Sequence, residues 1–308
     1  MTDEEKCGMA QNRLMLIVNP NAGRKRGKRL APKVIGWLRE GGFNCRLFIT
    51  KKCGDGTRFA QRHGGEYDVV VCMGGDGTLN EVINGILKGG HNVSLGYIPA
   101  GSTNDFARSL NISKDPKTAV NDIIKGHTVQ IDTGKYCDRY FSYVASFGAF
   151  TKTSYSTPQV LKNVLGRFSY FVRGAGEVFS LRPEHIEVDA DGKKFEGEYL
   201  FGAISNSKSI GGLVKYKDKM VDFSDGRLEM MLIKKPDSVV TLCKLANDML
   251  NQNFKSPYIK FCRAKEFKIK CKNDFDWTLD GEFAEGNDEL CISCVNKKLN
   301  IICPQKKD

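Results

Sequence analysis

The chain has 308 residues, of which 41% are hydrophobic and 27% are charged, as in an ordinary globular protein. Its length suits one large domain or two smaller ones, and its formal net charge of +11 favours anionic partners such as nucleotides, nucleic acids or an acidic membrane. No apolar stretch reaches the roughly 18 residues that span a bilayer, and the polar residues 1–6 are unlike a signal peptide, so we expect a cytoplasmic protein.

Strands and helices alternate over the first 130 residues. Apolar runs predict strands at 14–18, 45–49, 69–73 and 94–98. The stretches that follow them predict helices at 29–39, 57–63, 78–87 and 106–110. This order is typical of a doubly wound, mostly parallel α/β sheet, in which ligands bind beyond the carboxyl ends of the strands. The turns after the strands are therefore the candidate site.

One of these turns combines several features of a phosphate site. The strand at 69–73 ends in Gly74-Gly75-Asp76-Gly77, and we expect Thr78 to open the next helix, with Glu81 completing a capping box. Glycine lets a phosphate approach the backbone, and a helix N-terminus offers free N–H groups and a positive dipole end. The Asp76 carboxylate only accepts hydrogen bonds when it is ionised, so we expect it near a metal or a hydroxyl proton.

Two more polar turns follow neighbouring strands. Asn19-Pro20-Asn21-Ala22-Gly23 comes after the first strand, and Gly101-Ser102-Thr103-Asn104-Asp105 comes after the strand at 94–98. Each of them alone is explained by ordinary turn or N-cap chemistry. Three glycine turns at one edge of a sheet indicate a single phosphate site. The basic run at 24–29 is either a solvated helix start or a contact for phosphate or lipid headgroups.

Strand-like segments dominate after about residue 130. We expect them at 140–146, 195–204, 228–233, 267–271, 277–283, 289–295 and 299–303, with helices at 159–180 and 239–251. This predicts two domains, 1–130 and 131–308, the second a mostly antiparallel β-sandwich, with a cleft between them as the ligand site. The apolar residues of 159–180 either line an acyl tunnel or form ordinary core.

Two acidic turns, and the absence of several known sequence motifs, limit the kinds of reaction that the sequence suggests. Asp280 and Glu282 flank a glycine, and Asp222 and Asp225 lie in another acidic turn; each pair is either a plain turn or a set of oxygen ligands for a hard cation. The sequence lacks a GxxxxGK[ST] loop, a GxGxxG turn and the protein-kinase signatures, and its four histidines have no metal-binding spacing. The eleven cysteines lie mostly in apolar runs, so we expect reduced thiols.

Four motifs, in this order, resemble the soluble diacylglycerol kinase family of bacteria and its relatives, the sphingosine and ceramide kinases. They are Asn-Pro-Asn-Ala-Gly at 19–23, Gly-Gly-Asp-Gly-Thr-Leu-Asn-Glu at 74–81, Pro-Ala-Gly-Ser-Thr-Asn-Asp-Phe-Ala-Arg at 99–108 and Leu-Asp-Gly-Glu at 279–282. The resemblance covers residues 12–304. The core of the second motif is shared with NAD kinases, and the motifs around it make the resemblance specific to lipid kinases.

The resemblance implies an ATP-binding α/β domain, a C-terminal β-sandwich, and transfer of the γ-phosphate of ATP to a lipid hydroxyl, with diacylglycerol as the first candidate. It implies an acidic catalytic network of Asp76, Asp105, Asp280 and Glu282. It implies nucleotide contacts at Asn19, Pro20, Asn21, Ala22, Gly23, Thr50, Gly74, Gly75, Asp76, Gly77, Thr78, Leu79, Asn80, Glu81, Gly101, Ser102, Thr103 and Asn104. A structural Mg²⁺ falls on Asp222, Asp225 and the carbonyl of Arg227, although Tyr216-Lys-Asp-Lys-Met220 replaces the Pro-x-Ala segment usual in that family.

Several alternatives stay open from the sequence. The acceptor is alternatively a sphingoid base, ceramide, phosphatidylglycerol or NAD, and a non-catalytic nucleotide-binding regulator is the alternative from another class. A nucleic-acid binder is disfavoured, because the basic residues form no recognition motif with interleaved aromatics. We expect ATP and Mg²⁺ as cofactors, a lipid substrate, peripheral contact with an anionic membrane surface, and either a monomer or a homodimer.

Overall fold

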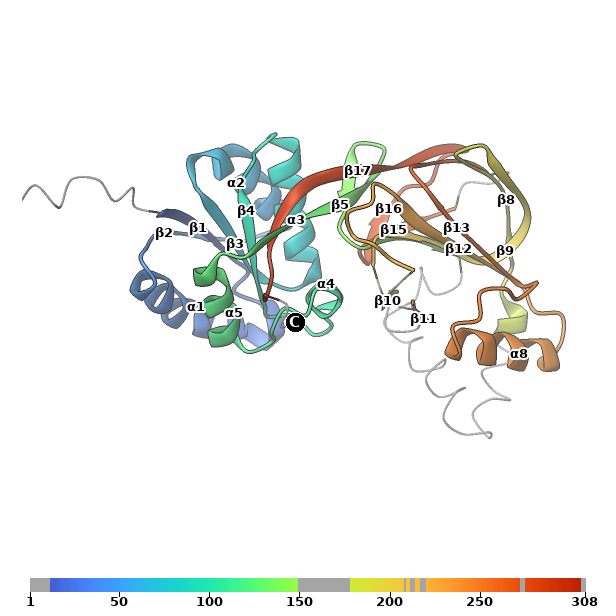
Figure 1. The fold of residues 1–308 in the computed structure, drawn as a ribbon, viewed down its shortest axis with the longest axis horizontal. Helices are drawn as coiled ribbons and strands as arrows, with labels where there is room; N and C mark the ends of the chain where they lie inside the picture. Colours follow the sequence, from blue (N-terminus) through green and yellow to red (C-terminus); the bar gives the residue numbers. More distant parts are fainter. Residues whose placement is uncertain are drawn as a thin grey trace, which may run out of the picture. The chain divides into compact units, whose positions relative to one another are not determined.

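The computed structural model describes residues 12–148, 178–207, 209–210, 214–216, 220–271 and 275–305, with the side chains of 24–26, 209–210 and 214–215 left out (Figure 1). The chain divides into two compact units. One comprises Met1–Gln130 and Lys298–Asp308, and the other comprises Ile131–Lys297. The last segment was predicted as part of the second domain and instead belongs to the first unit, because strand β17 (Glu289–Ile302) ends by pairing with β4.

The first unit is a parallel sheet flanked by helices, as predicted. Its strands are β1 (Asn12–Val18), β2 (Phe43–Ile49), β3 (Val69–Gly74) and β4 (Ser94–Pro99), paired in the order β2-β1-β3-β4 and then with the end of β17. Its helices are α1 (Ala22–Glu40), α2 (Asp55–His63), α3 (Asp76–Lys88), α4 (Asp105–Ser109) and α5 (Pro116–Lys125), with a short 3₁₀ turn η2 (Gly64–Glu66). Because β2 and β3 lie on opposite sides of β1, the strand order reverses there, which is where such folds bind ligands.

Burial on both faces explains why the strands of this sheet consist of continuous apolar runs. Alternate strand residues such as Leu16 and Met73 pack with α1 and α5 in one core cluster. The residues between them, such as Ile17, are also fully buried. Helix α5 was not predicted, although its signals are present: Asp115 caps the helix by accepting from the Thr118 N–H at 2.9 Å, Pro116 opens it and a left-handed Gly126 ends it.

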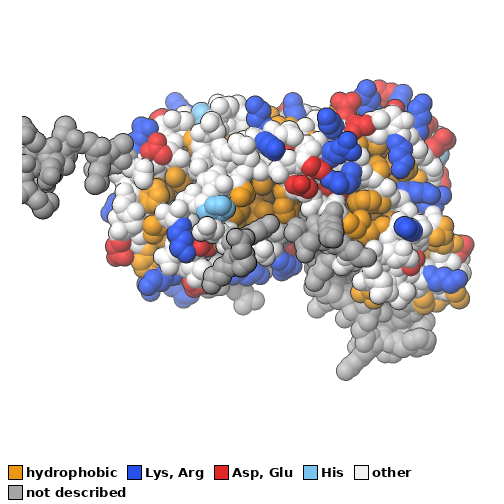
Figure 2. Space-filling view, in the orientation of Figure 1, with side chains coloured by type: hydrophobic (Ala, Val, Ile, Leu, Met, Phe, Trp, Pro, Cys, Tyr) orange, Lys and Arg blue, Asp and Glu red, His pale blue; other side chains and the backbone are white. Residues whose placement is uncertain are grey.

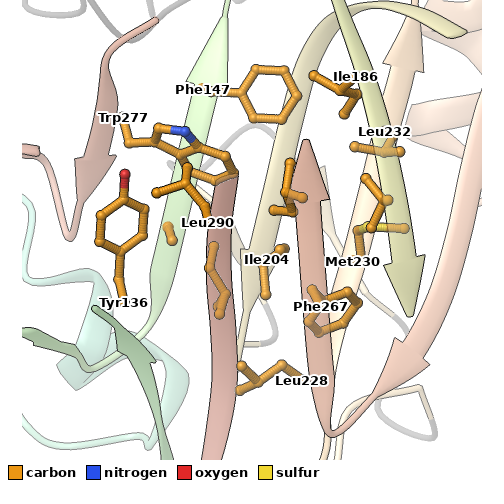
Figure 3. Close-up of a cluster of buried hydrophobic side chains, with 14 of the residues drawn as sticks. Tyr136, Phe147, Ile186, Ile204, Leu228, Met230, Leu232, Phe267, Trp277 and Leu290 are labelled. Carbon is orange, nitrogen blue, oxygen red and sulfur yellow. The ribbon is translucent and has the colours of Figure 1, made fainter. Parts of the chain in front are cut away.

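The second unit is built from antiparallel strands. They are β5 (Thr128–Tyr136), β6 (Arg139–Phe141), β7 (Val144–Gly148), β8 (Glu184–Ala190), β9 (Lys193–Ser205), β12 (Leu228–Lys234), β13 (Ile259–Ala264), β14 (Glu266–Cys271), β15 (Trp277–Leu279), β16 (Glu282–Ala284), β17 and the short pair β10 (Ser209–Ile210) and β11 (Val214–Lys215). Trp277, Phe147 and Phe267 are central to its buried apolar core, shown in Figure 3. Helix α8 (Val239–Leu250) agrees with the prediction at 239–251.

Several predicted boundaries were wrong. The segment 140–146 is two strands, β6 and β7, and 277–283 is a hairpin, because Asp280 and Gly281 adopt positive φ angles of 53° and 90°. The segments 289–295 and 299–303 are one continuous strand, β17, and strands β5, β8 and β13 were missed. Helices α1 and α3 begin earlier than expected, at Ala22 and Asp76. The helix predicted at 159–180 lies almost entirely outside the described residues.

Two glycines offer a matched test of the packing. A Cβ at Gly202 of β9 would overlap the buried ring of Phe147, whereas a Cβ at Gly36 of α1 would have no atom within 4 Å. We expect Gly202→Ala to lower the free energy of unfolding by about 1–3 kcal/mol through overpacking. Gly36→Ala should raise it by about 0.5–1 kcal/mol through helix propensity. Urea denaturation followed by tryptophan fluorescence measures both, and equal effects would contradict the packing described.

Candidate functional site

The turn after β1 is tied to the start of α3 through Asn19. The Asn19 side-chain amide donates to Thr78 Oγ1 at 3.0 Å, and its backbone N–H donates to the Met73 carbonyl at 3.0 Å. Asn19 Oδ1 accepts from the Asn21 N–H at 3.0 Å, which closes the turn on itself. A Cβ at Gly27 would overlap the Asn19 carbonyl, so only glycine lets the first turns of α1 approach this segment.

The turns after β3 and β4 touch each other. The Ala100 N–H donates to the Gly74 carbonyl at 2.7 Å, and a Cβ at Gly101 would lie 2.6 Å from Gly75 Cα. Asn104, in the left-handed conformation, closes the second of these turns: its Oδ1 accepts from the Gly101 N–H at 3.0 Å, and its amide donates back to the Gly101 carbonyl at 2.9 Å. All three predicted turns therefore meet at the carboxyl ends of the strands, while Ser102 and Thr103 are exposed.

The predicted capping box at the start of α3 was wrong. The helix starts at Asp76 without a side-chain cap, and Thr78 Oγ1 accepts from Asn19 instead. The Glu81 carboxylate reaches the start of α2, where it accepts the backbone N–H groups of Gly54 at 2.8 Å and Gly56 at 2.9 Å. Because Glu81 binds the start of α2, its side chain does not occupy the N–H groups at the start of α3.

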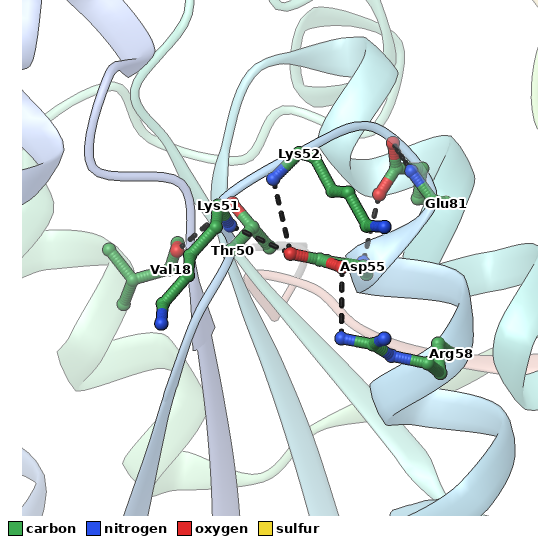
Figure 4. Close-up of polar contacts among 9 residues, drawn as sticks. Val18, Thr50, Lys51, Lys52, Asp55, Arg58 and Glu81 are labelled. Atoms are coloured by element: carbon green, nitrogen blue, oxygen red, sulfur yellow. Dashed lines mark hydrogen bonds and ion pairs between the residues drawn. The ribbon is translucent and has the colours of Figure 1, made fainter.

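The loop after β2 is held by a carboxylate that the sequence analysis did not single out (Figure 4). Asp55 Oδ2 accepts the backbone N–H groups of Lys51 at 2.8 Å and Lys52 at 3.1 Å, and Arg58 pairs with Oδ1 at 3.0 Å. These contacts, the Lys51 N–H first, hold the pKa of the Asp55 carboxyl below its usual value. Thr50, a predicted nucleotide contact, is buried and donates its N–H to the Val18 carbonyl at 2.9 Å. An acidic residue in the first turn of a helix was the available signal.

Asp76 and Asp105, two of the predicted catalytic residues, lie together in the first unit. Each begins a helix, where the positive end of the dipole stabilises an ionised carboxylate. The Phe106 N–H donates to Asp76 Oδ1 at 3.4 Å, which links the two helix starts. Arg108 pairs with Asp105 Oδ1 at 3.2 Å. The structure thus gathers two carboxylates at the glycine turns.

Asp280 and Glu282 share the β15–β16 hairpin of the second unit but differ in environment. Asp280 is 4% exposed and accepts four hydrogen bonds: from Ser142 N–H and Oγ, both at 2.6 Å, and from the Tyr143 and Val144 N–H groups at 2.9 and 3.0 Å. Burial raises the pKa of its carboxyl, and these donors act against that rise. Glu282 is exposed at the start of β16. Asp280 therefore holds the loop between β6 and β7, while Glu282 faces solvent.

The turn predicted to hold a metal closes on itself. Asp222 Oδ1 accepts from the Ser224 N–H at 3.0 Å, and Asp225 Oδ1 accepts from the Arg227 N–H at 3.0 Å. Beneath it lies Asp132 of β5, a fully buried residue that the sequence analysis missed. Asp132 accepts from the Gly226 N–H at 2.6 Å and the Lys297 N–H at 2.7 Å.

Buried Glu229 adds a further carboxyl group at this turn. Burial first, and then the carboxylates of Asp222 and Asp132, raise the pKa of Glu229 to about 8. Together with Asp225, these groups make four carboxyl groups beside a single paired guanidinium, that of Arg263, in the described part of the unit. Such a surplus of oxygen ligands fits Mg²⁺.

Comparison with known proteins decides the family. Residues 13–136 match the diacylglycerol kinase catalytic domain, and residues 146–303 match the YegS C-terminal NAD kinase beta sandwich-like domain. The chain is 34% identical over 279 residues to the diacylglycerol kinase of Staphylococcus saprophyticus, covering 89% of the chain and 90% of that relative. It is 34% identical to the diacylglycerol kinase of Staphylococcus aureus strain bovine RF122, covering 89% and 87%. The chain belongs to the diacylglycerol kinase family.

Membership of the diacylglycerol kinase family agrees with the fold. A crystal structure of a diacylglycerol kinase from Bacillus anthracis str. Sterne superposes with a TM-score of 0.74 at 20% identity, covering 96% of this chain and 98% of that one. The predicted architecture, an α/β nucleotide-binding domain followed by a β-sandwich, is confirmed, and the chain is a lipid kinase. Among the described residues, no helix is long and apolar enough to cross a membrane.

Substitution of the two hairpin carboxylates tests whether Asp280 stabilises the fold while Glu282 does not. Asp280→Asn turns an amide N–H₂ toward donors that converge on the carboxylate, so we expect the free energy of unfolding to fall by about 2–3 kcal/mol. Glu282→Gln alters an exposed group and should change it by no more than about 0.5 kcal/mol. Urea denaturation monitored by circular dichroism compares them. An Asp280→Asn protein as stable as Glu282→Gln would show that the four hydrogen bonds do not hold the loop.

Proposed function

We propose that this kinase transfers the γ-phosphate of ATP to the hydroxyl of diacylglycerol, giving phosphatidic acid. The curated relatives that carry the name diacylglycerol kinase support this acceptor. The observation that carries the proposal is the junction of three glycine turns with two carboxylates in the first unit, made by the contacts of Asn19 with Thr78, of Gly74 with Ala100 and of Asp76 with Phe106.

We assign the phosphate contacts to the backbone of these turns. The N-terminal N–H groups of α3 and the glycines at 74–77 and 101 offer donors and close backbone approach, as ATP phosphates need. Asn19–Gly23, Thr50, Thr78–Glu81 and Ser102–Asn104 complete the proposed nucleotide contacts, with Glu81 and Thr50 acting by holding loops. Mg²⁺, when bound, would neutralise phosphate charge, and Asp76 and Asp105 are the carboxylates that would hold it.

The acceptor hydroxyl needs a carboxylate that orients it or takes its proton. We assign that role to Glu282, because its side chain is exposed at the start of β16, directly after the Asp280-Gly281 turn. Asp280 is a positioning residue, since its carboxylate is committed to the backbone of Ser142, Tyr143 and Val144. Asp222, Asp225 and the carbonyl of Arg227 would hold a structural Mg²⁺ in the second unit. A homodimer stays a prediction from the sequence.

Two carboxyl-to-amide variants test the catalytic assignment. Asp76→Asn and Glu282→Gln remove acceptors of a proton or a metal while keeping size, so we expect each to lower ATP-dependent lipid phosphorylation by about 10²–10⁴-fold. Radiolabelled ATP with a panel of diacylglycerol, sphingosine, ceramide, phosphatidylglycerol and NAD measures turnover and identifies the acceptor. Glu66→Gln, an exposed carboxyl in the first unit, is the control.

Near-normal turnover in both variants would refute the catalytic roles of Asp76 and Glu282. Phosphorylation of NAD alone would assign the chain to the alternative acceptor. ATP binding without turnover of any acceptor would favour the non-catalytic regulator.

We further propose peripheral contact with an anionic membrane through helix α8. Val239, Val240 and Leu250 are 49%, 63% and 61% exposed on this helix. Lys244 on the same helix and Lys255 after it are also exposed, and Figure 2 shows orange and blue side chains side by side over this region. Exposed apolar side chains flanked by lysines match the two contributions to interfacial binding, acyl-chain contact and attraction to anionic headgroups.

Vesicle binding tests this surface. We expect Val240→Ser/Leu250→Ser to weaken sedimentation with phosphatidylglycerol vesicles by about tenfold, because apolar area no longer enters the interface. Binding of the unaltered chain should fall as salt rises, since screening weakens headgroup attraction. Leu47→Ser/Ile49→Ser on β2, where these side chains are 40% and 47% exposed, is the control. Equal loss in both double variants, or salt-insensitive binding, would contradict docking through α8.

A further inference from the structure

Glu229 is a buried acid whose carboxylate oxygens are not hydrogen-bonded. It lies on β12, directly opposite Ser205 of β9 and Arg263 of β13, so the three side chains project from the same face of the sheet. The Glu229 side chain is 0% exposed, and neither of its oxygens has a hydrogen-bond partner among the described residues. A buried carboxyl group without hydrogen bonds is costly, and a cation that comes within reach of its oxygens lowers that cost.

Arg263 is the cation that the structure places there, and it is shared. Its Nη2 pairs with the Asp225 carboxylate, while its Nε lies 3.4 Å from Glu229 Oε1 without a hydrogen bond to it. The guanidinium could make a two-bond contact with a single carboxylate, which is its strongest arrangement. In this structure the guanidinium instead contacts two acids, the partly exposed Asp225 and the buried Glu229.

The surroundings are rich in further acceptors. Asn206 Oδ1 is buried and lacks a hydrogen-bond partner within the described ranges, and the buried hydroxyls of Ser205 and Tyr216 can both donate and accept. Asn206 is linked to the same loop, because its side-chain amide donates to the carbonyls of Asp132 at 2.7 Å and Phe223 at 3.3 Å. The carboxyl oxygens of Glu229 and Asn206 Oδ1, which lack hydrogen-bond partners among the described residues, favour a positive charge in addition to that of Arg263.

We propose that Arg263 competes with the structural metal for the Asp225 carboxylate. The metal binds Asp225 only when the Arg263 guanidinium moves from Asp225 to Glu229. Glu229 is then the second partner of the Arg263 guanidinium. The exchange is favourable because the oxygens of Glu229 have no other hydrogen bonds among the described residues. This inference rests on the magnesium site proposed above and adds two residues, Arg263 and Glu229, that set its affinity. Neither needs to touch the metal, so both are positioning residues.

Metal binding to the ATP-free full chain tests the exchange, with Mn²⁺ as the probe and its free signal measured by electron paramagnetic resonance. Arg263→Gln/Glu229→Gln removes the competitor and its buried partner together, so no buried charge is left unpaired. We expect this variant to bind Mn²⁺ about tenfold more tightly, as when an interaction of about 1.4 kcal/mol no longer has to be broken. Glu229→Gln alone should weaken Mn²⁺ binding, because Arg263 loses its second partner and stays paired with Asp225.

Two controls keep the outcomes distinct. Lys270→Gln/Glu289→Gln removes an exposed ion pair of 2.8 Å in the same unit and should leave Mn²⁺ affinity unchanged. Asp225→Asn should abolish the site. If the unaltered chain binds Mn²⁺ through Asp225 but the Arg263→Gln/Glu229→Gln variant binds no more tightly, the competition is refuted and the metal site stands. If no variant binds Mn²⁺, both the competition and the magnesium site are refuted, and the lipid assay still judges the kinase function.

Discussion

The loops of this molecule depend on carboxylates that accept backbone N–H groups from segments far away in the sequence. Asp280 binds the 142–144 loop, Asp132 binds the turns at Gly226 and Lys297, and the partly buried Glu81 binds the start of α2. The buried Asp280 and Asp132 satisfy donors that burial would otherwise leave unpaired, at a much higher free-energy cost than the bonds gain. An ionised oxygen pair suits this task because it only accepts.

This use of acids changes how the acidic motifs of the family are interpreted. The resemblance to lipid kinases implies one catalytic group that includes Asp280 and Glu282, yet their environments separate them into a scaffold and an exposed carboxylate. The same division holds in the first unit, where Glu81 within the glycine-rich motif fixes a loop while Asp76 stays at the helix start. One acid of each motif therefore holds the backbone of another segment in place, as precise positioning of reacting groups requires.

The sequence predicted the parallel sheet of the first unit because the signals for its strands are local. Apolar strands ending in glycine turns predicted the sheet and the meeting of its three turns, since strands of one sheet share an edge. Asp55 and Asp132 were missed for opposite reasons. Asp55 carries a helix-start signal in its own segment, whereas the partners of Asp132 lie 94 and 165 residues away, and no local pattern announces them. The capping box failed because a distant loop competed successfully for Glu81.

The second unit shows the same limit more strongly, because antiparallel pairing joins segments that are remote in sequence. The break between β6 and β7 has no glycine or proline; it follows from the Asp280 carboxylate, which draws the N–H groups of 142–144 out of the ladder. The opposite error occurred at 295–299, where polar residues suggested an interruption although strand β17 continues through them. In both cases hydrogen bonding from another element outweighed the local pattern. Buried polar positions such as Glu229 and Asp132, which hydropathy alone would place at the surface, are accordingly where this chain differs most from what its sequence predicts.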